Sequence, residues 1–179
     1  MSRGEALNDQ DRLPWLSHLR EVGIRKVEEE IGRRSDQSGV TVAGEGVGVV
    51  LACSSLKGFY RQILRGNLKV ERAPEMPNHG ETAYQLQEVD RETSSPQPQT
   101  CFVWIKGDKE TLEDRLLKRQ NHFFKAGLLD SQFEALEPPE GEPDVVVVPL
   151  GPSTEGQTEM ALEWLGAKVS STPDPKPYT

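Results

Sequence analysis

The sequence predicts an α/β protein in which helices cover both faces of a parallel sheet. Three short apolar runs, at residues 47–53, 101–106 and 144–150, carry this prediction. They are rich in β-branched residues and end at glycine, serine or proline, as strands buried on both faces do. A segment with helical spacing of apolar residues follows each run, which gives strand and helix in alternation.

Before the first run we expect a helix with an apolar stripe that reaches residue 27. Asn8 or Asp9 would cap it, and Pro14 stands near its first turn. A mobile, serine- and glycine-rich insertion is expected over about residues 30–46. Its glycines suggest a dinucleotide-binding loop only superficially, because that loop follows a strand and opens a helix, whereas this one precedes a strand.

The first expected strand leads into a helix over residues 56–65 that Gly66 ends. Its inward side chains are Phe59, Tyr60, Ile63 and Leu64, and its outward ones are Lys57, Arg61 and Arg65. Ligands bind at such strand-to-helix junctions in open α/β sheets. Ser54 and Ser55 at this junction either cap the helix or contact a ligand, and both interpretations stay open.

The rest of the chain gives one domain over residues 1–169. Residues 67–99 are expected to form a largely mobile surface insertion, with a short strand indicated only at 83–89. A helix is expected near residues 111–119, and Ser153 or Thr154 would cap a last helix. Residues 170–179 contain three prolines and are expected to be a disordered tail.

Composition limits the class of protein. With 29 acidic and 21 basic residues the net charge is −8, which argues against a nucleic-acid or membrane-surface binder but allows a small anionic ligand. No run approaches the roughly 20 apolar residues of a membrane span, and no secretory pattern opens the chain. We therefore expect a soluble cytoplasmic protein. Cys53 and Cys101 are expected to be buried free thiols.

Residues 115–136 gather cations and paired aromatics in an otherwise acidic chain. Taken alone, the pattern favours an amphipathic surface helix whose charges face solvent. The other interpretation is a mobile segment that closes over phosphates, and neighbouring motifs have to decide between the two.

Several segments together resemble the gluconokinases, which are P-loop small-molecule kinases similar in fold to shikimate and adenylate kinases. In chain order they are LNDQDRLPWL (7–16), LACSSLK (51–57), IKGD (105–108), RLLKR (115–119), HFFK (122–125), LLDSQFEALE (128–137) and DVVVV (144–148). The resemblance runs from about residue 2 to residue 165, with insertions near 30–46 and 67–99. It implies a three-layer P-loop kinase fold.

The resemblance implies transfer of the γ-phosphoryl group of ATP, with Mg²⁺, to the terminal hydroxyl of D-gluconate, which gives 6-phosphogluconate for the pentose phosphate route. Such transfer depends on positioning and on neutralising charge. The implied nucleotide and lid residues are Arg115, Arg119, His122, Lys125 and Gln132. The implied sugar-acid residues are Arg12, Ser54, Ser55, Lys57 and Arg61, and Arg119 and Lys57 are the implied catalytic pair. A homodimer is left open.

The sequence departs from the family at its most specific motif. No G-x-x-x-x-G-K-[ST] occurs in the 179 residues, and the resemblance begins near Met1, so the first strand, P-loop, first helix and second strand have no counterpart. We therefore expect no metal ligand within these residues. In the family the P-loop strand lies between the strands equivalent to 47–53 and 101–106, so unpaired backbone groups would remain at both strand edges. Marginal stability and no gluconate phosphorylation by this chain alone are the expected consequences.

Two other functions stay open. A non-catalytic remnant could bind a sugar acid, or a protein partner through an open strand edge. A generic acidic interaction domain is the third interpretation, and it would make the motif matches accidental.

Overall fold

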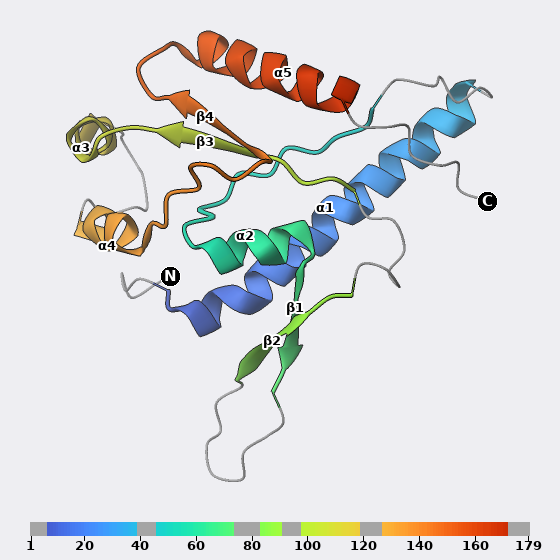
Figure 1. Cartoon of the computed structure of the whole chain (residues 1–179), viewed down its shortest axis with the longest axis horizontal. Helices are drawn as coiled ribbons and strands as arrows, with labels where there is room; N and C mark the ends of the chain where they lie inside the picture. Colours follow the sequence, from blue (N-terminus) through green and yellow to red (C-terminus); the bar gives the residue numbers. More distant parts are fainter. Residues whose placement is uncertain (1–6, 39–45, 74–82, 91–97, 119–126, 172–179) are drawn as a thin grey trace. The chain divides into compact units, whose positions relative to one another are not determined.

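The computed structural model describes residues 7–38, 46–73, 83–90, 98–118 and 127–171. The chain divides into two compact units, each described here by itself. Unit 1 comprises Met1–Thr100 and Glu134–Pro138, and unit 2 comprises Cys101–Phe133 and Pro139–Thr179. The elements in chain order are α1 (Asp9–Ser38), α2 (Gly58–Arg65), β1 (Leu68–Arg72), β2 (Tyr84–Glu88), β3 (Phe102–Lys106), α3 (Lys109–Lys118), α4 (Gly127–Ala135), β4 (Val145–Pro149) and α5 (Thr154–Ser171) (Figure 1).

Helix α1 starts where the sequence predicted, and Asn8 is its cap. The Asn8 side-chain oxygen accepts the N–H of Asp11 at 2.9 Å, and the Asp11 carboxylate accepts the N–H of Asn8 at 3.0 Å. This reciprocal pair satisfies two backbone donors that a helix start leaves without partners. Leu13 and Leu16 on the following turns are buried in unit 1.

The same helix is longer than predicted, because it continues to Ser38, whereas the sequence predicted an insertion from about residue 30. Glu30 forms ion pairs with Arg33 at 2.6 Å and Arg34 at 2.9 Å, three and four residues further along the chain. Charged pairs at this spacing lie on one helix face and stabilise it. The serine-rich composition concealed this pattern. Of the predicted mobile insertion, residues 39–45 lie outside the described residues.

Helix α2 confirms the predicted helix and its end. Gly66 adopts φ 78° and ψ 22°, the left-handed conformation that glycine tolerates best. Its N–H donates to carbonyl oxygens in the last turn of the helix. Tyr60, Ile63 and Leu64 are buried as predicted, and Phe59 is half-buried. The prediction for Arg61 was wrong, because this side chain is 3% exposed instead of facing solvent.

The described parts of residues 67–99 contain two strands, where the sequence indicated one. Strands β1 and β2 form an antiparallel two-stranded sheet in which Val70 lies opposite Leu86, and β2 confirms the strand indicated at 83–89. The side chain of Gln10 on α1 fixes the start of β2, since it accepts the Tyr84 N–H at 2.8 Å and donates to the Tyr84 carbonyl at 3.3 Å. Residues 74–82 and 91–97 lie outside the described part.

The predicted strand at 47–53 is not a strand in the structure. Over the described residues this segment pairs with no other strand, and the Val50 side chain is 98% exposed. A strand exists only through hydrogen bonds to a neighbour, so an apolar β-branched composition without a partner does not make one. The predicted three-stranded parallel sheet is therefore a two-stranded one among the described residues.

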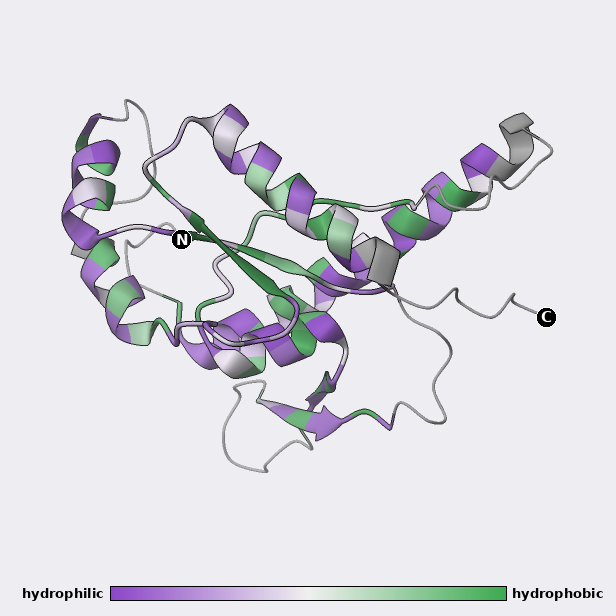
Figure 2. Ribbon diagram, turned by 45° about the horizontal axis from the view of Figure 1, so that its top comes forward, coloured by the Kyte–Doolittle hydropathy of each residue, from purple (hydrophilic) through white to green (hydrophobic). Residues whose placement is uncertain are grey.

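Unit 2 contains that sheet, in which β3 and β4 pair in parallel with Trp104 beside Val147. Both strands were predicted, and Figure 2 shows β4 coloured as hydrophobic over most of its length. Helix α5 packs along β4. Its cap is Ser153, whose hydroxyl accepts the Gly156 N–H at 3.2 Å.

The end of the chain corrects one further prediction. Helix α5 continues to Ser171, so residues 170 and 171 are helical and not part of a disordered tail, while 172–179 lie outside the described residues. Within the described segments, no helix is both long enough and apolar enough to span a membrane.

Candidate functional site

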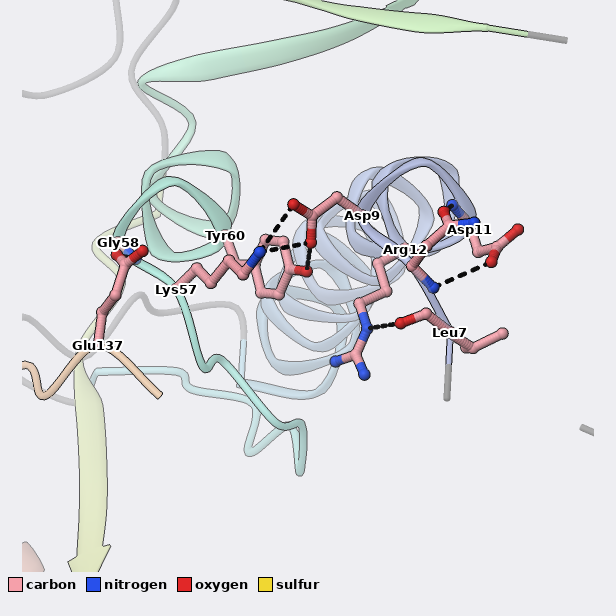
Figure 3. A network of polar contacts seen from close by, with 9 residues as sticks. Leu7, Asp9, Asp11, Arg12, Lys57, Gly58, Tyr60 and Glu137 are labelled. Atoms are coloured by element: carbon pink, nitrogen blue, oxygen red, sulfur yellow. Dashed lines mark hydrogen bonds and ion pairs between the residues drawn. The ribbon is translucent and has the colours of Figure 1, made fainter. Parts of the chain in front are cut away.

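The start of α1, the start of α2 and the residue before α2 bring three polar side chains together in unit 1. Lys57 Nζ lies 2.9 and 2.8 Å from the two carboxylate oxygens of Asp9. The Tyr60 hydroxyl donates to the same carboxylate at 2.5 Å (Figure 3). We call Asp9, Arg12, Lys57 and Tyr60 the helix-start cluster.

Arg12 completes this cluster on the side of α1. Its guanidinium carbon lies 5.9 Å from the centroid of the Tyr60 ring, within the range of a cation–π contact. Its Nε donates to the Leu7 carbonyl at 3.1 Å, which ties the guanidinium to the chain just before the helix (Figure 3). Two cations, Arg12 and Lys57, thus lie on either side of one carboxylate and one phenol.

The charges in the cluster support one another. The hydrogen bond from Lys57, followed by that from Tyr60, lowers the pKa of Asp9 below its ordinary value. Burial, followed by the hydrogen bond to Asp9, raises the pKa of Tyr60 above its ordinary value. At neutral pH the carboxylate is therefore ionised and the phenol keeps its proton as a donor.

The segment 54–57 carries three predicted sugar-acid residues, and Arg61 holds it in place. An Arg61 guanidinium nitrogen donates to the carbonyls of Ser55 at 2.9 Å and Leu56 at 3.2 Å. Ser54 is exposed, and the Ser55 hydroxyl lies 3.4 Å from Cys53 Sγ. Of the two interpretations of the serines, helix capping is wrong, because Lys57 occupies the cap position of α2.

A residue far along the chain supplies the missing cap. Lys57 makes no side-chain capping bond, and the Glu137 carboxylate instead accepts the Gly58 N–H at 2.5 Å. The Glu137 N–H donates to the Leu56 carbonyl at 2.8 Å. An anionic oxygen at a helix start is favourable because the first N–H groups have no partner inside the helix.

Two of the predicted nucleotide residues, Arg115 and Gln132, are described, and both belong to unit 2. Arg115 on α3 is exposed, and its guanidinium donates to the Leu150 carbonyl at 3.0 Å. Gln132 on α4 is half-buried. Arg119, His122 and Lys125 lie outside the described residues, so the structure does not test their predicted role.

The sequence interpretation missed Asp9, Tyr60 and Glu137 as members of the site. The sequence contained a signal for the first two. Asp9 lies three residues before Arg12, and Tyr60 lies three residues after Lys57. Residues at this spacing face the same side of a helix. No local signal marks Glu137, because its partner Gly58 is 79 residues away.

Cys53 and Cys101 are free thiols, but both are half-buried and not buried as predicted. In the described segments, no three His, Cys, Asp or Glu side chains gather in a group that could hold a metal ion.

Comparison with other proteins places the chain among sugar-acid kinases by sequence. It is 40% identical over 140 residues to a probable gluconokinase of Xenopus tropicalis, a match that covers 78% of this chain and 57% of that protein. It is 32% identical over 165 residues to the thermoresistant gluconokinase of Escherichia coli K12, covering 91% of this chain and 68% of that protein. No family model matches the chain.

Solved structures agree with this placement. A gluconokinase from Sinorhizobium meliloti 1021 superposes with a TM-score of 0.55 at 28% identity, covering 95% of this chain and 70% of that one. An unliganded sugar kinase from Janibacter sp. HTCC2649 superposes with a TM-score of 0.63 at 26% identity, over 97% and 75% of the two chains. These matches confirm the α/β class, and with the sequence identities they show that the chain belongs to the gluconokinase family.

Proposed function

We propose that the chain carries the sugar-acid site and the nucleotide lid of a gluconokinase, which transfers the γ-phosphoryl group of ATP to D-gluconate. The helix-start cluster is the observation that carries this proposal. It assembles Arg12 and Lys57, from two separate segments that resemble the family, around Asp9 and Tyr60.

The chemistry of the cluster suits a polyhydroxy acid. The cations Arg12 and Lys57 match the carboxylate, and a guanidinium can do so with two parallel hydrogen bonds. An ionised Asp9 and a protonated Tyr60 offer an acceptor and a donor for the hydroxyl groups. The side chains of Lys57 and Asp9 are 26% and 46% exposed, so a small ligand can reach both.

On the nucleotide side, we propose that Arg115, Arg119, His122, Lys125 and Gln132 approach ATP, as the resemblance implies. Transfer needs cations that neutralise charge on the moving phosphoryl group. We propose that Mg²⁺ supplies part of this neutralisation, as the resemblance implies. Cytoplasmic location and a homodimer remain predictions.

The 179 residues contain no P-loop motif, so we further propose that this chain by itself binds gluconate without phosphorylating it. Titration calorimetry with D-gluconate and with D-glucose tests the sugar-acid site, because glucose offers similar hydroxyls but no carboxylate. We expect heat of binding only with gluconate, and no gluconate-dependent ADP release by the same sample. A chain that binds neither sugar, or both equally, contradicts the site.

A further inference from the structure

Two long-range contacts fix the backbone on both sides of Lys57. Before it, the Leu56 carbonyl accepts the Glu137 N–H at 2.8 Å and an Arg61 guanidinium nitrogen at 3.2 Å. After it, the Gly58 N–H donates to the Glu137 carboxylate at 2.5 Å (Figure 3). Lys57 is thus a single extended residue, with φ −102° and ψ 151°, between two fixed peptide groups.

We propose that Glu137 is a positioning residue of the sugar-acid site, which aims the Lys57 ammonium group at Asp9 by holding the backbone around it. The inference rests on the proposed function for its consequence, gluconate binding. Its geometric part concerns only Glu137, Lys57 and Asp9, and it can be tested without any substrate.

The direction of a lysine side chain starts from its backbone. Lys57 Nζ reaches both Asp9 oxygens, at 2.9 and 2.8 Å, from a residue that precedes α2 and makes no capping bond of its own. The ammonium group stands on a flexible four-carbon stem, so a fixed backbone reduces the number of positions that the group can take. Glu137 supplies that constraint through its carboxylate and its N–H.

The residue at position 58 is matched to this contact. A Cβ added to Gly58 would lie 3.0 Å from the Glu137 carboxylate oxygen Oε2, which is tighter than an ordinary contact. Glycine therefore lets the carboxylate approach the start of the helix closely.

Glu137→Ala removes the carboxylate that holds the Gly58 N–H after Lys57, and the pKa of Asp9 reports the loss. Without a fixed Lys57, Asp9 loses its strongest pKa-lowering contact, so its pKa should rise. Deleting a negative charge alone would instead lower the pKa of a nearby carboxyl, so the sign separates positioning from simple electrostatics. ¹³C NMR titration of the Asp9 carboxyl measures it, and calorimetry should show gluconate binding weakened about tenfold, as expected when a charge-assisted contact is lost.

Glu134→Ala is the matched control, because it deletes the same charge from an exposed position in the same segment. This variant should change neither the Asp9 pKa nor the affinity for gluconate. Glu137→Gln keeps an acceptor oxygen, so it should largely keep the Asp9 pKa and the gluconate affinity of the unaltered chain. The proposal is overturned if Glu137→Ala leaves the Asp9 pKa unchanged or lowered, if Glu134→Ala matches it, or if the glutamine variant is as impaired as the alanine variant.

Should Glu137→Ala fail to melt cooperatively, Glu137→Asp decides the question, because it keeps the charge but shortens the side chain by one methylene and so withdraws the carboxylate from the Gly58 N–H. A raised Asp9 pKa in that variant supports positioning, and an unchanged one overturns it. If the unaltered chain does not bind gluconate, the proposed function fails, and the Asp9 titration still decides the role of Glu137.

Discussion

Replacing Lys57 by methionine is expected to weaken gluconate binding by about tenfold or more, since a hydrogen bond to a charged group contributes about 1.5–3 kcal/mol. Methionine keeps an unbranched apolar side chain of similar length, so packing beside Tyr60 is largely preserved. Only the ammonium group is lost. The same change removes the first cause of the low Asp9 pKa, which should therefore rise.

Lys69→Met provides the control for this experiment. Lys69 lies on β1 in the same unit, and its exposed ammonium group pairs with Glu71 at 3.1 Å, away from the helix-start cluster. Exposed pairs contribute little to stability, so this variant should bind gluconate as the unaltered chain does. Equal affinity of the Lys57 variant and the control would remove Lys57 from the site.

Arg119→Ala is expected to reduce turnover by about 100-fold in a protein that combines these residues with a P-loop segment. Loss of a positioned charge beside the reacting group typically costs about 3 kcal/mol in the transition state. The prediction rests on the resemblance alone, since Arg119 lies outside the described residues. Steady-state kinetics at saturating gluconate and ATP measure the effect.

Arg34→Ala is a suitable comparison, because Arg34 is exposed on α1 and pairs with Glu30. It should leave kcat unchanged. If Arg119→Ala also leaves kcat unchanged, residues 115–119 are better described as an ordinary solvent-facing helix end than as part of a nucleotide lid.

Local patterns in the sequence were sufficient where an element's own residues decide its state. The apolar runs at β3 and β4 and the helix that ends at Gly66 were predicted to within about two residues, which is the uncertainty of any boundary assignment. Each has a strong periodicity and a stop signal that acts locally.

The errors arose where contacts outside the element decide its structure. Residues 47–53 have the composition of a strand but no strand partner among the described residues, and Arg61 is buried because it binds carbonyls of the preceding segment. Glu137 caps a helix 79 residues earlier in the chain. Such contacts leave no periodicity in the sequence. The family resemblance points to Lys57 and Arg12, but no sequence pattern points to the residues that hold them.

The most direct test of gluconokinase activity is the formation of 6-phosphogluconate by a protein in which a P-loop segment of the family precedes these residues. We predict ATP-dependent product with D-gluconate and none with D-glucose. A folded protein that binds ATP but forms no 6-phosphogluconate, or that phosphorylates glucose equally well, would contradict the proposed function.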